Sequence, residues 1–280
     1  MIDNRIAIIG GTGKFGQHLG KRLEDGNKIA ISGSSVEKAE EIASEHGWEY
    51  GRSKEIVKGA DIVIVAVPIE VTVDTIHEIG EAVPQDALLC DITSVKKQPV
   101  EAMKQYSDEV LGMHPMYAPS NSIKGQKVVL CPEKGKKWTE MEEFWKEHGA
   151  KVHLTEPEKH DEAVSVVQGM AHFSELVMAE TLRRSDIRED LSGYSSPVYE
   201  VFEAMMGRML NQKPGLYRSI QSRNDANTGM RKKFIESAEE MAEMVESGDG
   251  FDERFDELGE LFDLEESQER SDSLIEFMRR

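Results

Sequence analysis

Cysteine is scarce in this 280-residue chain, which contains only Cys90 and Cys131, each within an apolar, strand-like run. Two such residues form neither a disulfide framework nor a cysteine-based metal site, so the sequence predicts two buried thiols and no metal. Long apolar runs are missing as well, because none reaches the roughly 18 residues that a membrane-spanning helix needs. We therefore expect no association with a membrane.

Basic residues are also in deficit. The chain has 34 lysines and arginines against 53 aspartates and glutamates, which gives a formal net charge of -19. A nucleic-acid-binding protein would need clustered cations to neutralise phosphates, so we expect no nucleic-acid partner. The first residues run directly into an apolar strand instead of a signal peptide, which predicts a cytoplasmic protein.

The first half of the chain alternates strand-like and helix-like segments. Residues 61–67 are apolar on both faces, as a buried parallel strand should be, and Pro68 ends that run. Apolar runs of this kind predict strands at residues 5–9, 28–32, 61–67, 87–91, 110–113, 127–131 and 151–154. The alternation predicts a doubly wound, mainly parallel Rossmann-type sheet in residues 1–156.

After about residue 156 the strand signals disappear and helical spacing of apolar residues takes over. The helices expected there are residues 159–182, 197–211, 216–222 and 230–246. Phe251, Phe255, Leu258 and Phe262 recur at helical spacing, which predicts a further amphipathic helix with an acidic face. The pattern therefore predicts an all-helical C-terminal domain in residues 157–280.

A glycine-rich G-x-G-x-x-G motif lies between the first strand and the first helix. In that position it is typical of dinucleotide binding: Gly11 would permit a tight turn, Gly13 would let the backbone approach a pyrophosphate, and Gly16 would allow close helix packing. The diphosphate would then rest on the helix N-terminus. The cofactor contacts expected are Gly11, Thr12, Gly13, Lys14, Phe15 and Gly16, with Val67 and Pro68 at the end of the third strand.

The end of the second strand bears on the choice between NAD and NADP. An NAD-specific site usually offers an acidic residue there, whereas this chain has Ser34 and Ser35, followed by Lys38. Small hydroxyls and a cation suit a 2′-phosphate better than a carboxylate would, so the sequence favours NADP. If the two serines only cap the next helix, either cofactor would be accepted.

Polar residues follow two neighbouring strands of the expected sheet. Asp91 ends one strand, Ser94 and Lys96 follow in its loop, and His114 closes the next strand. Open α/β sheets bind ligands at this edge, and a neutral imidazole near pH 7 is able to take a proton. A lone histidine is usually structural, but these companions favour a catalytic role for His114.

Three segments resemble the prephenate dehydrogenase family of tyrosine biosynthesis: DITSVK (91–96), GMHPM (112–116) and SPVYEVFEAMMGRMLNQKPGLY (196–217). KHDEAVSVVQGMAHF (159–173) is similar to the first helix of that family's C-terminal domain. The shorter, monofunctional archaeal-type enzymes look most similar. The resemblance implies a nucleotide-binding domain followed by a helical dimerisation domain, and hence a homodimer.

The resemblance also implies a reaction, the NAD(P)-dependent oxidative decarboxylation of prephenate to 4-hydroxyphenylpyruvate. His114 would take the proton of the substrate 4-hydroxyl, and Ser94 would hydrogen-bond the same hydroxyl or orient the imidazole. The family uses an arginine matching Arg208 to bind prephenate. The substrate-binding candidates are Arg208, Lys96, Tyr217, Gln168 and His172, of which Gln168 and His172 are equally compatible with core packing.

Three other interpretations stay open at this point. Arogenate, which carries an amine instead of the side-chain keto group, is an alternative substrate. A deazaflavin-type NADP oxidoreductase has a similar glycine loop but would need neither His114 nor Arg208. A regulatory protein could bind a nucleotide through the same loop and catalyse nothing.

Overall fold

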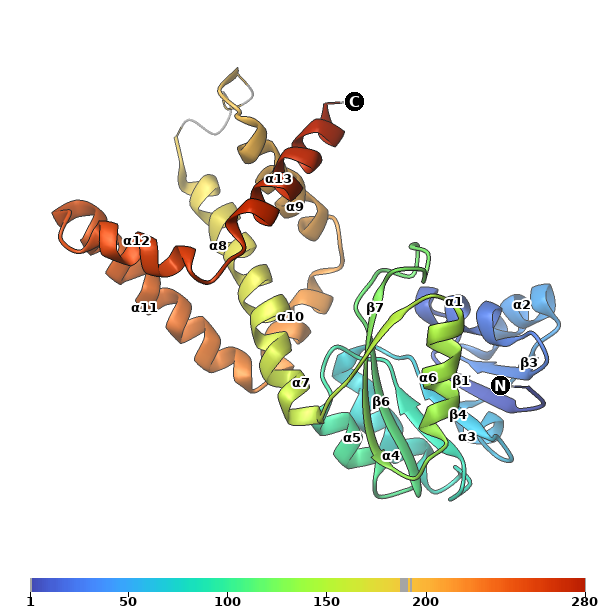
Figure 1. Cartoon of the computed structure of the whole chain (residues 1–280). Coiled ribbons are helices and arrows are strands. Elements are labelled where there is room, and N and C mark those ends of the chain that lie inside the picture. Colours follow the sequence, from blue (N-terminus) through green and yellow to red (C-terminus); the bar gives the residue numbers. More distant parts are fainter. Residues whose placement is uncertain (1, 187–190, 192, 280) are drawn as a thin grey trace. The chain divides into compact units, whose positions relative to one another are not determined.

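The computed structural model describes residues 2–186, 191 and 193–279, and the chain divides into two compact units. The sheet unit comprises residues 1–164 and 222–224, and the helical unit comprises residues 165–221 and 225–280. Figure 1 colours most of the sheet unit blue to green and most of the helical unit yellow to red. The boundary predicted after residue 156 precedes helix α7 (Pro157–Val164), which belongs to the sheet unit.

The sheet unit is built on eight strands in the order β3-β2-β1-β4-β5-β6-β7-β8. Their bounds are β1 (Arg5–Ile9), β2 (Lys28–Ser32), β3 (Glu49–Tyr50), β4 (Ile62–Val65), β5 (Leu88–Asp91), β6 (Glu109–Pro115), β7 (Lys127–Lys134) and β8 (Lys151–Leu154). Neighbouring strands are parallel except for the antiparallel pair β6 and β7. The predicted doubly wound, mainly parallel sheet is confirmed, and its chain order reverses between β1 and β4.

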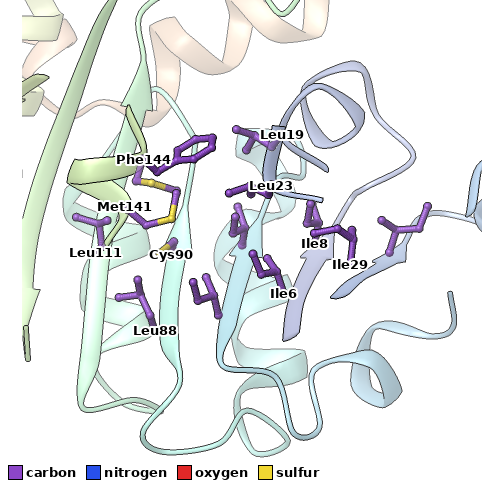
Figure 2. Packing of buried hydrophobic residues seen from close by; sticks show 14 of the residues in the cluster. Ile6, Ile8, Leu19, Leu23, Ile29, Leu88, Cys90, Leu111, Met141 and Phe144 are labelled. Atoms are coloured by element: carbon purple, nitrogen blue, oxygen red, sulfur yellow. The ribbon is translucent and has the colours of Figure 1, made fainter. Parts of the chain in front are cut away.

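Helices cover both faces of this sheet. They are α1 (Lys14–Leu23), α2 (Val36–His46), α3 (Ser53–Ile56), α4 (Ile69–Gly80), α5 (Lys97–Met103) and α6 (Trp138–Glu147). Side chains alternate along each strand, so Ile6 and Ile8 of β1 join one core and Ala7 and Ile9 join the other. Figure 2 shows the first core, in which Leu19 of α1 and Phe144 of α6 pack over the strands.

The two cysteines lie in this unit as free, buried thiols, as predicted. Burial raises the pKa of the Cys131 thiol to about 12, and it raises that of Cys90 as well. Both therefore stay protonated at neutral pH and behave as small apolar side chains.

The helical unit contains only helices and turns among its described residues. They are a π-helical turn η1 (Ser165–Met170) followed by α8 (Ala171–Arg184), α9 (Pro197–Leu210), α10 (Pro214–Arg223), α11 (Ala226–Ser247), α12 (Phe251–Gly259) and α13 (Leu264–Met278). Residues 159–182 are helical throughout, as predicted, but the winding changes to a π-helix over η1, between α7 and α8. The expected C-terminal helix is two helices, since Asp263 caps a new one by accepting from the N–H of Glu266.

The described part of the chain contains no helix that is both long enough and apolar enough to cross a membrane.

Candidate active site

The glycine loop joins β1 to α1 where the strand order reverses. The positive φ of this loop, +83°, belongs to Gly10, while Gly11 and Thr12 are the central residues of the turn that the N–H of Gly13 closes by donating to the carbonyl oxygen of Gly10 at 2.9 Å. A Cβ on Gly11 would lie 2.6 Å from Cγ2 of Ile31, so packing against β2 excludes a side chain there. A Cβ on Gly16 would lie 2.5 Å from the carbonyl oxygen of Gly10, which is the close helix packing expected of this position.

The start of α1 fits the diphosphate of a dinucleotide. Gly13 is the N-cap residue, no side chain caps the helix, and its first turn holds no acidic residue. Exposed N–H groups and the helix dipole favour an anion at such an end. Cγ1 of Val67 lies 3.0 Å from the position of a Cβ on Gly10, so the end of β4, which continues into Pro68, flanks the loop.

Other residues of the loop are already engaged in packing. Oγ1 of Thr12 lies 2.2 Å from the position of a Cβ on Gly33, so the loop lies directly against the end of β2. The ring of Phe15 packs against the rings of His18 and Tyr117, each with centroids 5.6 Å away. Lys14 is exposed. Cofactor contacts by these side chains stay predictions.

The two serines after β2 differ in what they do. Ser35 caps α2, because its hydroxyl accepts a hydrogen bond from the N–H of Lys38 at 3.1 Å. Ser34 is exposed. The hydroxyl of Ser34 therefore does not cap α2. Contact of either serine with a 2′-phosphate stays a prediction.

Asp91 and Lys96 tie the loop after β5 to the neighbouring strand β6. The buried Asp91 carboxylate accepts from the backbone N–H (2.9 Å) and the hydroxyl (2.6 Å) of Thr93, and it pairs with the Lys96 ammonium. Lys96 also donates to the carbonyl oxygen of Met113 at 2.8 Å and is fully buried. A direct contact of Lys96 with substrate stays a prediction, and this structural use of its ammonium argues against one.

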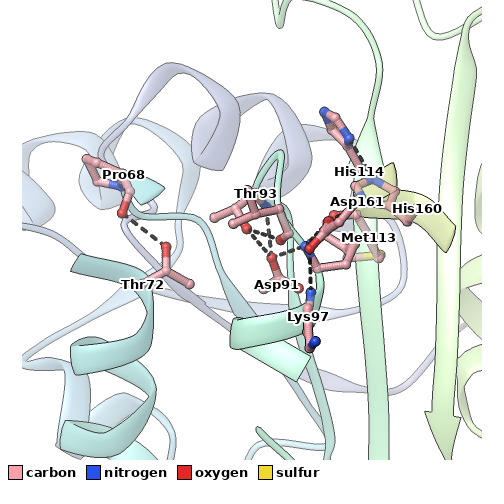
Figure 3. A network of polar contacts seen from close by, with 11 residues as sticks. Pro68, Thr72, Asp91, Thr93, Lys97, Met113, His114, His160 and Asp161 are labelled. Atoms are coloured by element: carbon pink, nitrogen blue, oxygen red, sulfur yellow. Dashed lines mark hydrogen bonds and ion pairs between the residues drawn. The ribbon is translucent and has the colours of Figure 1, made fainter. Parts of the chain in front are cut away.

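The structure brings His114 to the same edge as the Asp91 loop, because β5 and β6 are parallel neighbours with Asp91 opposite Gly112. The imidazole is 3% exposed, and its Nδ1 lies 2.9 Å from Nε2 of His160 in α7. Nδ1 of His160 lies 2.8 Å from Oδ1 of Asp161, so the three side chains form a hydrogen-bonded series (Figure 3). Ser94 is half-buried in the loop, and its contact with substrate or imidazole stays a prediction.

The surroundings of His114 keep its imidazole neutral. Burial lowers the pKa of His114 well below its ordinary value, and nearby His160 and Lys96 lower it further. Burial lowers the pKa of His160 too, although its hydrogen bond to Asp161 acts in the opposite direction. A neutral, buried imidazole at the carboxyl end of a parallel sheet is suited to accept a proton from a bound ligand.

The helical unit brings other candidates together. The rings of His172 in α8 and Tyr217 in α10 meet edge to face with centroids 4.9 Å apart. Burial and the Glu175 carboxylate raise the pKa of Tyr217, while the Arg208 guanidinium lowers it. Arg208 is exposed on α9, and Gln168 is half-buried in η1. The cluster of His172, Glu175, Arg208 and Tyr217 combines a cation with hydrogen-bonding side chains, which suits an anionic ligand, whereas a place for Gln168 beside it stays a prediction.

The sequence interpretation missed His160 and Asp161, although both lie in the segment quoted for its family resemblance. The sequence signal for them was an adjacent His-Asp pair near the start of a helix. Helical spacing alone does not show that this pair lies beside His114 on strand β6. Among the described residues, no group of three histidines, cysteines or carboxylates could hold a metal ion.

Comparison with known proteins matches both halves of the chain. Residues 19–154 match the nucleotide-binding domain of prephenate dehydrogenase, and residues 156–264 match its dimerization domain. A probable arogenate/prephenate dehydrogenase of Methanocaldococcus jannaschii is 38% identical over 256 residues, which cover 87% of this chain and 57% of that protein. The T-protein of Haemophilus influenzae is 31% identical over 268 residues, 92% of this chain and 67% of that protein.

A solved structure shares the fold. The prephenate dehydrogenase from A. aeolicus, in complex with hydroxyphenyl propionate and NAD+, has a TM-score of 0.76 and 21% identity, covering 92% of this chain and 97% of that one. The chain spans a little more than half the length of its M. jannaschii relative. The match of residues 156–264 extends the similarity into the helical unit. The alternative of a deazaflavin-type NADP oxidoreductase rests on the glycine loop, so it does not explain this second match.

Proposed function

Because the chain belongs to the prephenate dehydrogenase family, we propose that it catalyses the NAD(P)-dependent oxidative decarboxylation of prephenate to 4-hydroxyphenylpyruvate. The observation that carries this proposal is the buried, neutral His114 at the carboxyl edge of a dinucleotide-type sheet. When bound, the nicotinamide would accept the hydride that leaves C4 of the substrate. His114 removes the proton of the 4-hydroxyl as C4 becomes carbonyl-like, and loss of carbon dioxide makes the ring aromatic.

The cofactor would be bound by the glycine loop and the start of α1. We propose NADP as the preferred form, because the end of β2 offers Ser34 and the exposed Lys38 instead of an acidic residue. NAD stays the alternative, since Ser35 already caps α2. No metal is required by this chemistry.

Substrate binding would depend on the cluster in the helical unit. Arg208 supplies a planar guanidinium suited to a carboxylate, and Tyr217, whose pKa that guanidinium lowers, and its ring neighbour His172 supply hydrogen-bonding groups. Arogenate is the second candidate substrate because Glu175 belongs to the same cluster. Its carboxylate raises the pKa of Tyr217 and could accept hydrogen bonds from the arogenate ammonium.

We further propose that the protein works in the cytoplasm as a homodimer assembled through the helical unit. Large apolar side chains are exposed there, such as Phe202 (48%), Phe255 (67%) and Phe277 (72%). A subunit interface would remove such side chains from water.

The test is spectroscopic: reduction of NADP or NAD is followed with prephenate and then arogenate as substrate. His114→Asn should lower kcat by about 10²- to 10⁴-fold, the contribution of a positioned base, while dinucleotide binding is retained. His153→Asn, on the exposed part of β8, is the matched control and should leave kcat unchanged. Near-normal turnover by His114→Asn would overturn the assignment, and no turnover of either substrate by the unaltered protein would overturn the proposed function.

A further inference from the structure

The hydrogen-bonded series His114, His160 and Asp161 is buried within the sheet unit. The three residues are 3%, 2% and 9% exposed, and they join the end of β6 to α7. A buried polar series of this kind is costly unless every member is satisfied, so the hydrogens within it are strongly constrained.

Asp161 sets the direction of these hydrogen bonds. Its Oδ1 accepts from the backbone N–H of Lys96 at 2.8 Å, and its Oδ2 accepts from the N–H of Lys97 at 3.0 Å. Each carboxylate oxygen thus faces a donor, so Asp161 acts toward its neighbours as an acceptor. Nδ2 of Asn224 donates to the backbone carbonyl oxygen of Asp161 at 2.7 Å, which further fixes its position.

The state of each imidazole follows from this acceptor. Nδ1 of His160 must carry the hydrogen that it donates to Asp161, so a neutral His160 has no hydrogen on Nε2. That Nε2 is an acceptor, so Nδ1 of His114 must carry the hydrogen between the two rings. A neutral His114 then has its lone pair on Nε2.

We propose that His160 and Asp161 are positioning residues that fix His114 in the tautomer whose Nε2 accepts the substrate proton. This inference rests on the proposed function. In the reaction the hydroxyl O–H bond breaks and an Nε2–H bond forms on His114, which becomes an imidazolium. Its Nδ1–H then makes a charge-assisted hydrogen bond to His160, with the Asp161 carboxylate behind it, in the manner of a base oriented by a third group. The Lys96 ammonium opposes this charge, and Asp91 partly neutralises it.

The first test reads the tautomer without substrate. Nitrogen-15 NMR of protein labelled in histidine should show His114 protonated at Nδ1 and unprotonated at Nε2 at neutral pH, with its signals assigned by their loss in His114→Asn. The opposite tautomer would overturn the proposal. This result does not depend on turnover, so the positioning role and the proposed function can fail separately.

The second test compares two substitutions of His160. In His160→Gln the amide oxygen can accept from Nδ1 of His114, so kcat should stay within about 10-fold of normal; His160→Leu removes the acceptor and should lower kcat by about 10- to 100-fold with little change in KM. Melting temperature and dinucleotide binding report the fold of both variants. Equal activity of the folded Gln and Leu variants would overturn the positioning role. If His160→Leu does not fold, the His114 tautomer that NMR shows in the unaltered protein decides whether the proposal holds.

Discussion

The two units differ in how completely they bury their apolar side chains. In the sheet unit, strand residues such as Ile8, Val63 and Leu89 are fully buried between two layers of helices. In the helical unit, the buried apolar side chains among the described residues are Met206, Met209 and Ile220, whereas much larger side chains are exposed. From this difference we expect the sheet unit to be stable by its own packing, whereas the proposed homodimer would stabilise the helical unit.

The largest effect should come from truncating the same residue type in both units. Leu89→Ala removes a fully buried side chain from β5 and should lower the free energy of unfolding by about 2–5 kcal/mol. Leu258→Ala, at a position that is 40% exposed on α12, should cost the monomer less than about 1 kcal/mol. Denaturant unfolding at several protein concentrations measures both.

Under the proposed homodimer, the two variants should differ in self-association. Leu258→Ala should weaken self-association in analytical ultracentrifugation, whereas Leu89→Ala should leave the dissociation constant of the native dimer unchanged. A large, concentration-independent loss of stability in Leu258→Ala would show that α12 is packed within one chain, and the contrast between the units would then be false.

The proposed function assigns a different chemical group to each unit: the neutral base His114 to the sheet unit and the guanidinium of Arg208 to the helical unit. Arg208→Gln should raise KM about 10- to 100-fold, with a smaller change in kcat, because a charge-assisted hydrogen bond contributes about 1.5–3 kcal/mol. Arg183→Gln is the control, since Arg183 pairs with Glu180 on the exposed side of α8. Steady-state kinetics separate the two parameters, and an unchanged KM would remove Arg208 from the substrate site.

The sequence was sufficient for those features that depend on local pattern. Runs of apolar residues predicted the strands other than β3 (Glu49–Tyr50), and the glycine spacing predicted the loop before α1. The resemblance then selected His114 and Arg208 by motif. Neither the sequence pattern nor the family resemblance requires knowledge of which side chains are in contact.

What the sequence could not supply depends on long-range contacts. Asp161 meets the backbone of Lys96 and Lys97 across more than sixty residues of chain, and no periodicity reports such a contact. The motif predicts the turn at its first residue, Gly11, whereas the positive φ lies one residue earlier, at Gly10, where a Cβ would lie 2.5 Å from the carbonyl oxygen of Ala66. The π-helical turn at Ser165–Met170 escaped because apolar spacing does not distinguish it from an α-helix.

The smallest predicted effect concerns the preference between NADP and NAD, which should depend on residues of the sheet unit alone. Ser34→Asp places a carboxylate at the end of β2, where it would repel a 2′-phosphate and accept from a 2′-hydroxyl. The ratio of kcat/KM for NADP to that for NAD should fall by about 10-fold or more, equivalent to roughly 1.4 kcal/mol. Ser44→Asp adds the same charge further along α2 and should leave the ratio unchanged. Because Arg208 lies in the helical unit, Arg208→Gln should not alter this ratio, and a change in it would mean that cofactor choice depends on both units.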